Sequence, residues 1–202
     1  MIADVFHPMG IFEFDDEKTK PNAETKQWNR TRDFDDDLMF GYFFKDIIVL
    51  LLDKCGYEVY PYGYESFFPN LKRKLYNIEQ QDAAERIRST PDLLVKHPDE
   101  QRIDLVEVKA RTASGKRGIE INEVERYRKF WPESILVLVI PSGNYFYAQH
   151  ISKLNPKSSY APQDFRPFEE IFPLAAQLSE DFRRKLVRKV RTLCLNRDHA
   201  NL

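Results

Sequence analysis

The stretch PDLLVKHPDEQRIDLVEVK, residues 91–109, decides the fold expected for this chain. Its centre, HPDE at 97–100, is rich in turn-forming residues. The mainly apolar runs on either side of this turn predict a hairpin of two strands, over residues 92–96 and 102–109. An antiparallel hairpin is therefore the first element of the expected sheet.

Three further elements are predicted ahead of the hairpin. A helix over residues 36–54 is apolar on nearly every side, so we expect it to be buried. Gly56 fits the left-handed residue that ends such a helix. Residues 57–60 alternate in polarity and predict a short strand, while the apolar spacing of residues 70–88 favours a charged surface helix.

The elements predicted after the hairpin complete the sheet. A short helix is expected over residues 123–131, with Asn122 and Glu125 as its capping pair. Residues 135–140 are all apolar, as in a central strand covered on both faces, and residues 144–149 alternate like one more strand. The order predicts an α/β fold in which helices pack on a mixed sheet.

The two ends of the chain differ in charge. Residues 1–40 hold ten acidic and five basic residues, and we interpret 1–37 as an irregular polar arm. A helix predicted over 180–195 is apolar on one side and basic elsewhere. Docking of its apolar side on the core is compatible with a basic face that contacts phosphates. The chain then divides into the arm, a core of residues 38–150 and a C-terminal extension of residues 151–202.

The composition excludes several classes of protein. Of the 202 residues, 42% are hydrophobic and 31% charged, which excludes a disordered chain. A net charge of −1 excludes a globally basic nucleic-acid binder, so local patches would hold a polyanion. Two cysteines without metal-ligand spacing exclude a disulfide framework and a structural zinc site. The most apolar stretch, residues 38–52, is too short to cross a bilayer, and no signal peptide is evident, so we expect a cytoplasmic protein.

Charged residues gather at the open end of the hairpin, away from its turn. Side chains two positions apart on a strand share a face, so Glu107 lies beside Lys109, and the hairpin can place Asp92 next to them. Glu107 interrupts an apolar run, so its charge needs a metal ion or a cation. Two converging carboxylates suit a hard cation such as Mg²⁺, and a neighbouring lysine can orient a metal-bound water. The alternative is that Lys109 is only the structural partner of Glu107.

The segment that follows supplies further candidates. Arg111, Lys116 and Arg117 lie just beyond the carboxylates and are candidates for contacts with nucleic-acid phosphates. Glu123 and Tyr127 lie one turn apart on one side of the next helix. Both also have structural interpretations, since an acid suits the first helical turn and the tyrosine belongs to an apolar side.

Pro-Asp at 91–92 followed by Glu-x-Lys at 107–109 resembles the PD-(D/E)xK nuclease superfamily. That superfamily includes restriction endonucleases, archaeal Holliday-junction resolvases and RecB-type exonuclease domains. The resemblance covers about residues 38–150 and implies a restriction endonuclease-like core with the order α-β-β-β-α-β. It implies these site residues: Asp92, Glu107 and the backbone carbonyl of Val108 as metal ligands, and Lys109 as the group that activates water or stabilises charge.

The resemblance also points to the two neighbouring helices. RecB-like members carry Gln-x-x-x-Tyr on the helix after the third strand, and here Glu123 and Tyr127 stand at that spacing. Many members place a metal-assisting Glu on the first helix, about three turns before the Gly that ends it. In this chain Lys45 stands eleven residues before Gly56, and Asp46 follows it as a possible supporting acid.

These features predict a Mg²⁺-dependent endonuclease or exonuclease that hydrolyses phosphodiester bonds, with DNA as the preferred substrate and Mn²⁺ able to replace Mg²⁺. An RNA-directed nuclease is one alternative, since the chemistry is shared. Another is a catalytically silent copy of the fold that binds nucleic acid or acts as a scaffold, with Lys45 neutralising the carboxylates. One chain offers one site, so cutting both strands would suggest a two-fold homodimer.

Overall fold

The computed structural model describes most of the chain from residue 34 onward. The described residues are 34–64, 71, 75, 82–98, 101–111, 119–140, 145–157 and 159–199, with the backbone alone described over 34–40 and 193–199. The chain divides into two compact units, Met1–Arg30 and Thr31–Leu202, and every described residue belongs to the second. Residues 1–33 of the predicted polar arm, Lys116, Arg117 and much of the predicted helix over 70–88 lie outside the described residues. Residues 34–37, also predicted as part of the arm, instead form the start of the first helix.

A six-stranded mixed sheet forms the centre of the described unit. β3 and β5 run parallel, and every other neighbouring pair in this sheet is antiparallel. Across the sheet the strands are β1 (Glu58–Pro61), β2 (Leu93–Lys96), β3 (Ile103–Ala110), β5 (Ile135–Val139), β6 (Phe146–His150) and β8 (Arg166–Pro167). A smaller sheet pairs β4 (Ile119–Glu120) with β7 (Ser159–Tyr160).

The predicted hairpin and central strand are confirmed. β2 and β3 pair antiparallel with Leu93 opposite Val106, so the next positions along the two strands, Asp92 and Glu107, face each other at the end of β2. β5 is buried at every position between β3 and β6, which explains its unbroken apolar sequence.

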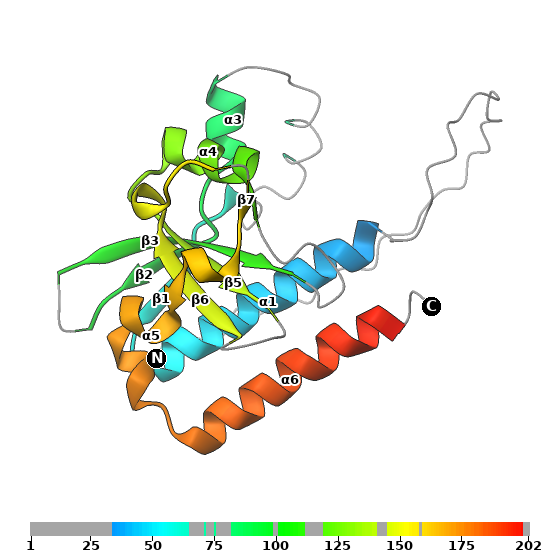
Figure 1. Cartoon of the computed structure of the whole chain (residues 1–202). Coiled ribbons are helices and arrows are strands. Elements are labelled where there is room, and N and C mark those ends of the chain that lie inside the picture. Colours follow the sequence, from blue (N-terminus) through cyan, green and yellow to red (C-terminus); the bar gives the residue numbers. More distant parts are fainter. Residues whose placement is uncertain are drawn as a thin grey trace, which may run out of the picture. The chain divides into compact units, whose positions relative to one another are not determined.

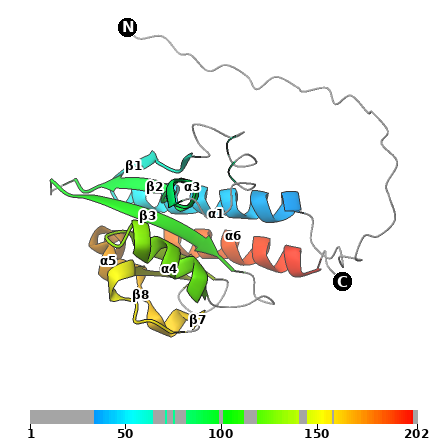
Figure 2. The same ribbon diagram turned by 90° about the horizontal axis from the view of Figure 1, so that it is seen from above.

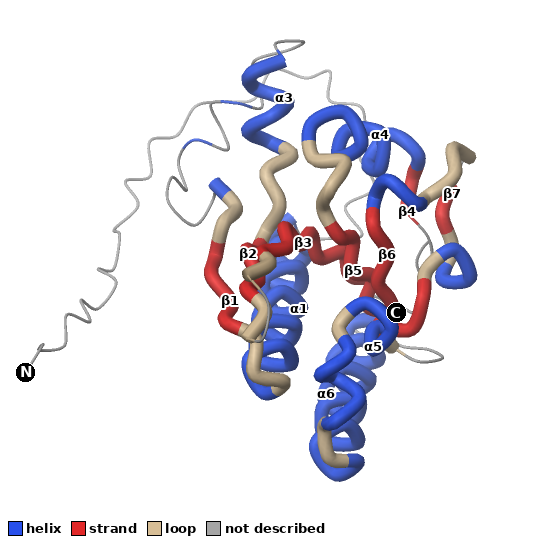
Figure 3. The backbone as a smooth tube through the Cα atoms, turned by 90° about the vertical axis from the view of Figure 1, so that its left-hand side faces the viewer, coloured by secondary structure: helices blue, strands red, loops and turns tan. Residues whose placement is uncertain are grey.

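Helices cover both faces of the sheet (Figures 1 and 3). α1 (Phe34–Lys54) and α6 (Glu180–His199) run side by side on one face, as Figure 2 shows from above. α4 (Ile121–Phe130) lies on the other face, on the same side as the short helix α3 (Asp82–Arg88). The expected α/β architecture, a mixed sheet flanked by helices, is therefore confirmed.

α1 is buried on the side that faces the sheet. Phe44, Ile48 and Leu52 are fully buried in a core cluster that includes residues of β2, β3 and β5. Leu50, on the other side, is 43% exposed, so the expectation that the helix is buried nearly all round was wrong. The chain leaves α1 through Gly56, whose φ of 91° confirms the predicted left-handed position.

α4 begins earlier than predicted, and its predicted capping pair is wrong. Its N-cap is Glu120, which makes no side-chain capping hydrogen bond. The helix follows directly after β4, so the pairing of β4 with β7 positions its first turn in place of a side-chain cap. Glu125 instead forms an ion pair with Arg128.

The segment after residue 150 belongs to the same unit as the predicted core. β8 extends the central sheet beside β6, and α5 (Phe168–Ile171) places Phe168 in the core cluster under α1. The helix predicted over 180–195 is found as α6, whose Leu186 and Val190 are buried in that cluster. Among the described residues, no helix has the length and apolar character needed to cross a bilayer.

Candidate active site

Asp92 is held in place by backbone groups on both sides. Its carbonyl oxygen accepts hydrogen bonds from the amides of Tyr62 (2.8 Å) and Gly63 (3.1 Å), just after β1. Its carboxylate accepts one from the amide of Val108, with 3.0 Å between Val108 N and Asp92 Oδ2. The carboxylate is therefore fixed at the N-terminal end of β2 and directed at β3.

Glu107 lies on the α4 face of β3 and is only 5% exposed. Burial raises the pKa of its carboxyl to about 7, and the negative charge of Asp92 acts in the same direction. The ammonium of Lys109, 2.7 Å from Glu107 Oε1, and a hydrogen bond from the hydroxyl of Tyr127 oppose this rise in pKa. The two carboxylates are thus close enough to repel each other.

The ammonium group of Lys109 is stabilised by its surroundings. Burial works to lower its pKa, but the charge and hydrogen bond of Glu107 and the charges of Glu123 and Asp92 together outweigh burial, so the pKa is raised. The Nζ atom also lies 5.6 Å from the centre of the Tyr127 ring, a favourable cation–π distance. Lys109 is therefore protonated at neutral pH.

Tyr127 combines the two interpretations given to it from the sequence. Its ring is buried beside Val124 in the core under α4. Its hydroxyl hydrogen-bonds Glu107, and burial together with that carboxylate raises the pKa of the hydroxyl well above its ordinary value. The hydroxyl therefore stays protonated and donates to Glu107.

Lys45 of α1 reaches the site from the other side of the sheet. Its Nζ lies 3.4 Å from Asp92 Oδ1, its side chain is 13% exposed, and it also stacks over Tyr42, 5.0 Å from the ring centre. Each carboxylate thus faces one ammonium group, Asp92 with Lys45 and Glu107 with Lys109. The contact with Tyr42 was missed from the sequence, although three positions on a helix bring two side chains together.

Asp46 and Glu123 do not add a third carboxylate to the pair. Asp46 is exposed, so the expectation that it is buried on α1 was wrong. Glu123 is bound to Arg111, with 2.7 Å between Oε2 and Nη2. In the part of the chain that the structure describes, no three Asp, Glu, His or Cys side chains are grouped to hold one metal ion.

Arg111 is the described member of the three residues expected to contact phosphates. Besides Glu123, its guanidinium donates to the carbonyl of Ala110 at 3.0 Å, and its amide donates to the carbonyl of Val139 at 2.9 Å. These bonds fix Arg111 at the C-terminal ends of β3 and β5. Its side chain is already engaged within the fold.

Comparison with known proteins does not assign the chain to a family. The chain matches none of the protein-family models against which it was compared, and no curated protein matches it.

Proposed function

We propose that the chain is a metal-dependent nuclease that hydrolyses phosphodiester bonds at Asp92, Glu107 and Lys109. The observation that carries the proposal is the pair of crowded carboxylates on neighbouring strands, in which burial and Asp92 raise the pKa of Glu107 to about 7. The order of α1, β1, β2, β3, α4 and β5, with α3 and β4 inserted and β5 parallel to β3, supports the restriction endonuclease-like core implied by the resemblance.

The oxygen donors around the carboxylate pair fit Mg²⁺. Asp92 and Glu107 would supply carboxylate oxygens, and the carbonyl of Val108 would supply a third ligand. In an extended strand the N–H and C=O of one residue point to the same side, so this carbonyl faces the side on which the Val108 amide meets Asp92. Bound Mg²⁺, or Mn²⁺ in its place, would polarise the scissile phosphate and lower the pKa of a bound water.

The remaining side chains orient the reacting groups. Because Lys109 is protonated, we assign it to holding the attacking water and offsetting phosphate charge, and not to removing the proton. Tyr127 donates to Glu107 and fixes the direction of its carboxylate. Asp92 is fixed by the amide of Val108, so both carboxylates need little reorganisation.

We assign nucleic acid, with DNA preferred, as the substrate class. The test is a panel of single-stranded, duplex and branched DNA and of RNA, each incubated with Mg²⁺ and with Mn²⁺. Cleavage by the parent protein and its loss in Asp92→Asn and Glu107→Gln would support the assignment. Asp53→Asn and Glu133→Gln, which change exposed carboxylates elsewhere, are the matched controls. Equal cleavage by all five proteins would overturn it.

A catalytically silent protein of the same fold is the second candidate, and the contact between Lys45 and Asp92 favours it. An ammonium group 3.4 Å from Asp92 Oδ1 already compensates part of the negative charge that a metal ion would need. A thermal-shift titration separates the two functions. A metal that binds only the folded state raises the melting temperature, so the nuclease predicts a rise with Mg²⁺ or Mn²⁺ that Asp92→Asn abolishes. The silent protein predicts no rise with either metal.

A further inference from the structure

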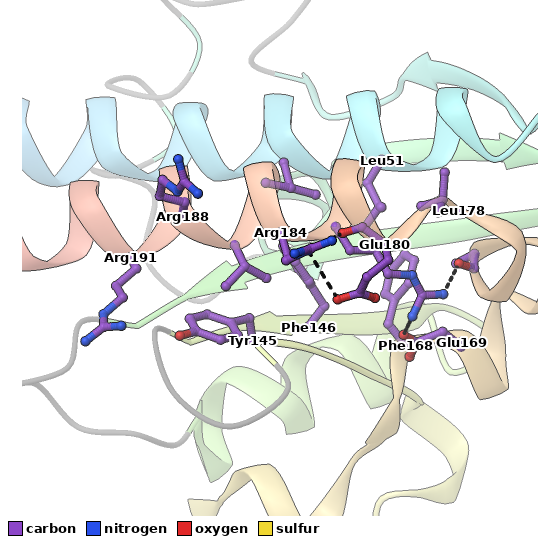
Figure 4. Close-up of a pocket in the computed structure, with 14 residues that line it drawn as sticks. Leu51, Tyr145, Phe146, Phe168, Glu169, Leu178, Glu180, Arg184, Arg188 and Arg191 are labelled. Carbon is purple, nitrogen blue, oxygen red and sulfur yellow. Dashed lines mark hydrogen bonds and ion pairs between the residues drawn. The ribbon is translucent and has the colours of Figure 1, made fainter.

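A pocket of about 620 Å³ lies between α6 and the sheet, on the face opposite Glu107 and Lys109 (Figure 4). We call it the α6 pocket. Apolar side chains of four elements line its inner part: Leu51 of α1, Phe146 of β6, Phe168 of α5 and Leu186 of α6. Tyr145, just before β6, lies across the pocket from α6. The inner lining of the α6 pocket is therefore apolar and partly aromatic. Two carboxylates also line the pocket, Glu169 paired with Arg183 and Glu180 paired with Arg184.

A row of arginines from α6 borders this lining. Arg184, Arg188 and Arg191 line the pocket and follow each other at intervals of four and three residues, which places them on one side of the helix. Arg184 is within 3.7 Å of Glu180. Within the described part of the chain, Arg188 and Arg191 have no hydrogen-bond or ion-pair partner (Figure 4). Two guanidinium groups are thus available to an anionic ligand.

The backbone at the pocket is strained. Tyr145 has a φ of 64°, the only positive φ among the non-glycine residues that the structure describes. A non-glycine residue rarely adopts this conformation, and such strain concentrates at ligand-binding positions. The strain favours a role for the Tyr145 ring beyond filling space.

Tyr145 and Phe146 of the α6 pocket lie at the same end of the sheet as the candidate active site. Phe146 pairs with Val139, and Val139 pairs with Ala110, the residue after Lys109. Strands are spaced by about 4.8 Å, so the start of β6 lies roughly 10 Å from the end of β3. A polymer chain that passes over this end of the sheet from the carboxylate pair therefore reaches Tyr145 and Arg191.

We propose that the α6 pocket binds an unpaired base of a single nucleic-acid strand, with Arg188 and Arg191 on the phosphates beside it. An aromatic and apolar lining suits the face of a base, and guanidinium groups suit phosphate, which is the combination that single-strand binding proteins use. Bases paired in a duplex are stacked and cannot enter such a pocket. This inference rests on the proposed function, because it assigns single-stranded or locally unpaired nucleic acid as the substrate class.

Binding without cleavage tests the inference. The affinity of the full chain for a labelled twelve-nucleotide DNA strand, and for its duplex, is measured by fluorescence anisotropy in EDTA at several salt concentrations. For the single strand, Arg188→Ala/Arg191→Ala is expected to weaken binding about tenfold. The slope of log affinity against log salt concentration should fall by about 1.4, because each lost phosphate contact removes about 0.7. The matched control is Lys185→Ala/Lys189→Ala, which removes two exposed charges of α6 that do not line the pocket.

Tyr145→Ala separates the base from the phosphates. We expect several-fold weaker binding of the single strand with an unchanged salt slope, because an uncharged ring is lost. Equal losses in the two double variants, an equal loss with the duplex, or an unchanged affinity in Tyr145→Ala would each overturn the inference. So would arginine-dependent binding to phosphatidylglycerol vesicles combined with unchanged binding of DNA.

The binding assay is independent of the catalytic proposal. It is run in EDTA, so its outcome depends neither on a bound metal ion nor on cleavage. Cleavage that survives Asp92→Asn would overturn the proposed function and leave the binding data as they are. Failure of the arginine and tyrosine variants to weaken binding would overturn the pocket assignment alone.

Discussion

The β2–β3 hairpin carries ionisable groups at both ends, and the two ends compensate them differently. At the turn end, one carboxylate, Asp104, is 12% exposed and meets His97 Nε2 at 2.7 Å and Arg102 Nη2 at 3.1 Å. We call these three residues the turn network. At the other end, the two carboxylates Asp92 and Glu107 lie so close that one raises the pKa of the other.

The difference distinguishes a structural network, at the turn, from a candidate catalytic site, at the carboxylate pair. In the turn network a single negative charge has two partners, so removing one partner costs stability. In the carboxylate pair, burial and mutual repulsion leave an unfavourable energy that Lys45 and Lys109 only partly compensate. A divalent cation would relieve it. We therefore expect substitutions at the turn end to act on stability alone, and those at the pair to act on activity and on the pH dependence of stability.

The largest expected effect comes from comparing one substitution at each end of the hairpin. Glu107→Gln is expected to lower the cleavage rate by about 10³-fold, since it removes a charged group that stabilises the reacting centre. Asp104→Ala, at the same strand, is expected to leave the rate within a few-fold and to destabilise the fold by about 3 kcal/mol. Initial rates with Mg²⁺ and urea unfolding measure the two quantities. A stable but inactive Asp104→Ala protein would contradict the comparison.

Much of this contrast could be predicted from the sequence. The turn residues at 97–100 and the apolar runs beside them predicted the hairpin, and the hairpin register places Asp92 opposite Glu107. The resemblance to the nuclease superfamily implied that Lys45, eleven residues before Gly56, stands next to the carboxylates, and Lys45 does contact Asp92. Local patterns suffice where strand pairing and helix period determine which side chains meet.

Other parts could not be predicted because they depend on long-range contacts. The hydroxyl of Tyr127 reaches Glu107 from a helix that packs across β3, which a helical pattern does not reveal. The first turn of α4 depends on the pairing of β4 with β7, two strands separated by 38 residues of the chain. The α6 pocket arises where α5 and β6 meet α6, so no single segment encodes it.

The dependence of stability on pH is the next largest expected effect. The carboxyl of Glu107 has an ordinary pKa of 4.5 and a folded-state pKa of about 7, so the folded state binds its proton more tightly than the unfolded state does. Stability from this proton is fully present below pH 4.5 and is lost as the pH rises to 7. The loss is about 3 kcal/mol, from about 1.36 kcal/mol per pKa unit.

Glu107→Gln isolates this contribution. The difference in unfolding free energy between the parent and Glu107→Gln should change by about 3 kcal/mol between pH 4.5 and 7, with the parent relatively weaker at the higher pH. Denaturant unfolding at several pH values measures it. Glu133→Gln, at an exposed position, should show no such change. A parallel pH dependence of the parent and Glu107→Gln would mean that burial and the charge of Asp92 do not raise the pKa of Glu107 in the folded state.

Tyr127→Phe is expected to have a smaller effect at the same site. The substitution keeps the buried ring and removes the hydroxyl that donates to Glu107, a bond worth about 1.5–3 kcal/mol. The pKa of Glu107 should rise further, which shifts the pH dependence above to higher pH. Tyr62→Phe, a half-buried tyrosine that packs against Trp131, is the control. Identical pH dependence in both variants would contradict the hydrogen bond to Glu107.

The smallest expected effect concerns Lys45, and it decides how the pair should be understood. If the ammonium of Lys45 competes with a metal ion for Asp92, Lys45→Met should tighten Mg²⁺ binding about fivefold, equivalent to about 1 kcal/mol for a partly exposed ion pair. The measurement is the rise in melting temperature with Mg²⁺ concentration. Lys54→Met, at an exposed position of the same helix, should leave the metal affinity unchanged. Weaker Mg²⁺ binding in Lys45→Met would show that Lys45 positions Asp92 for the metal and does not compete with it.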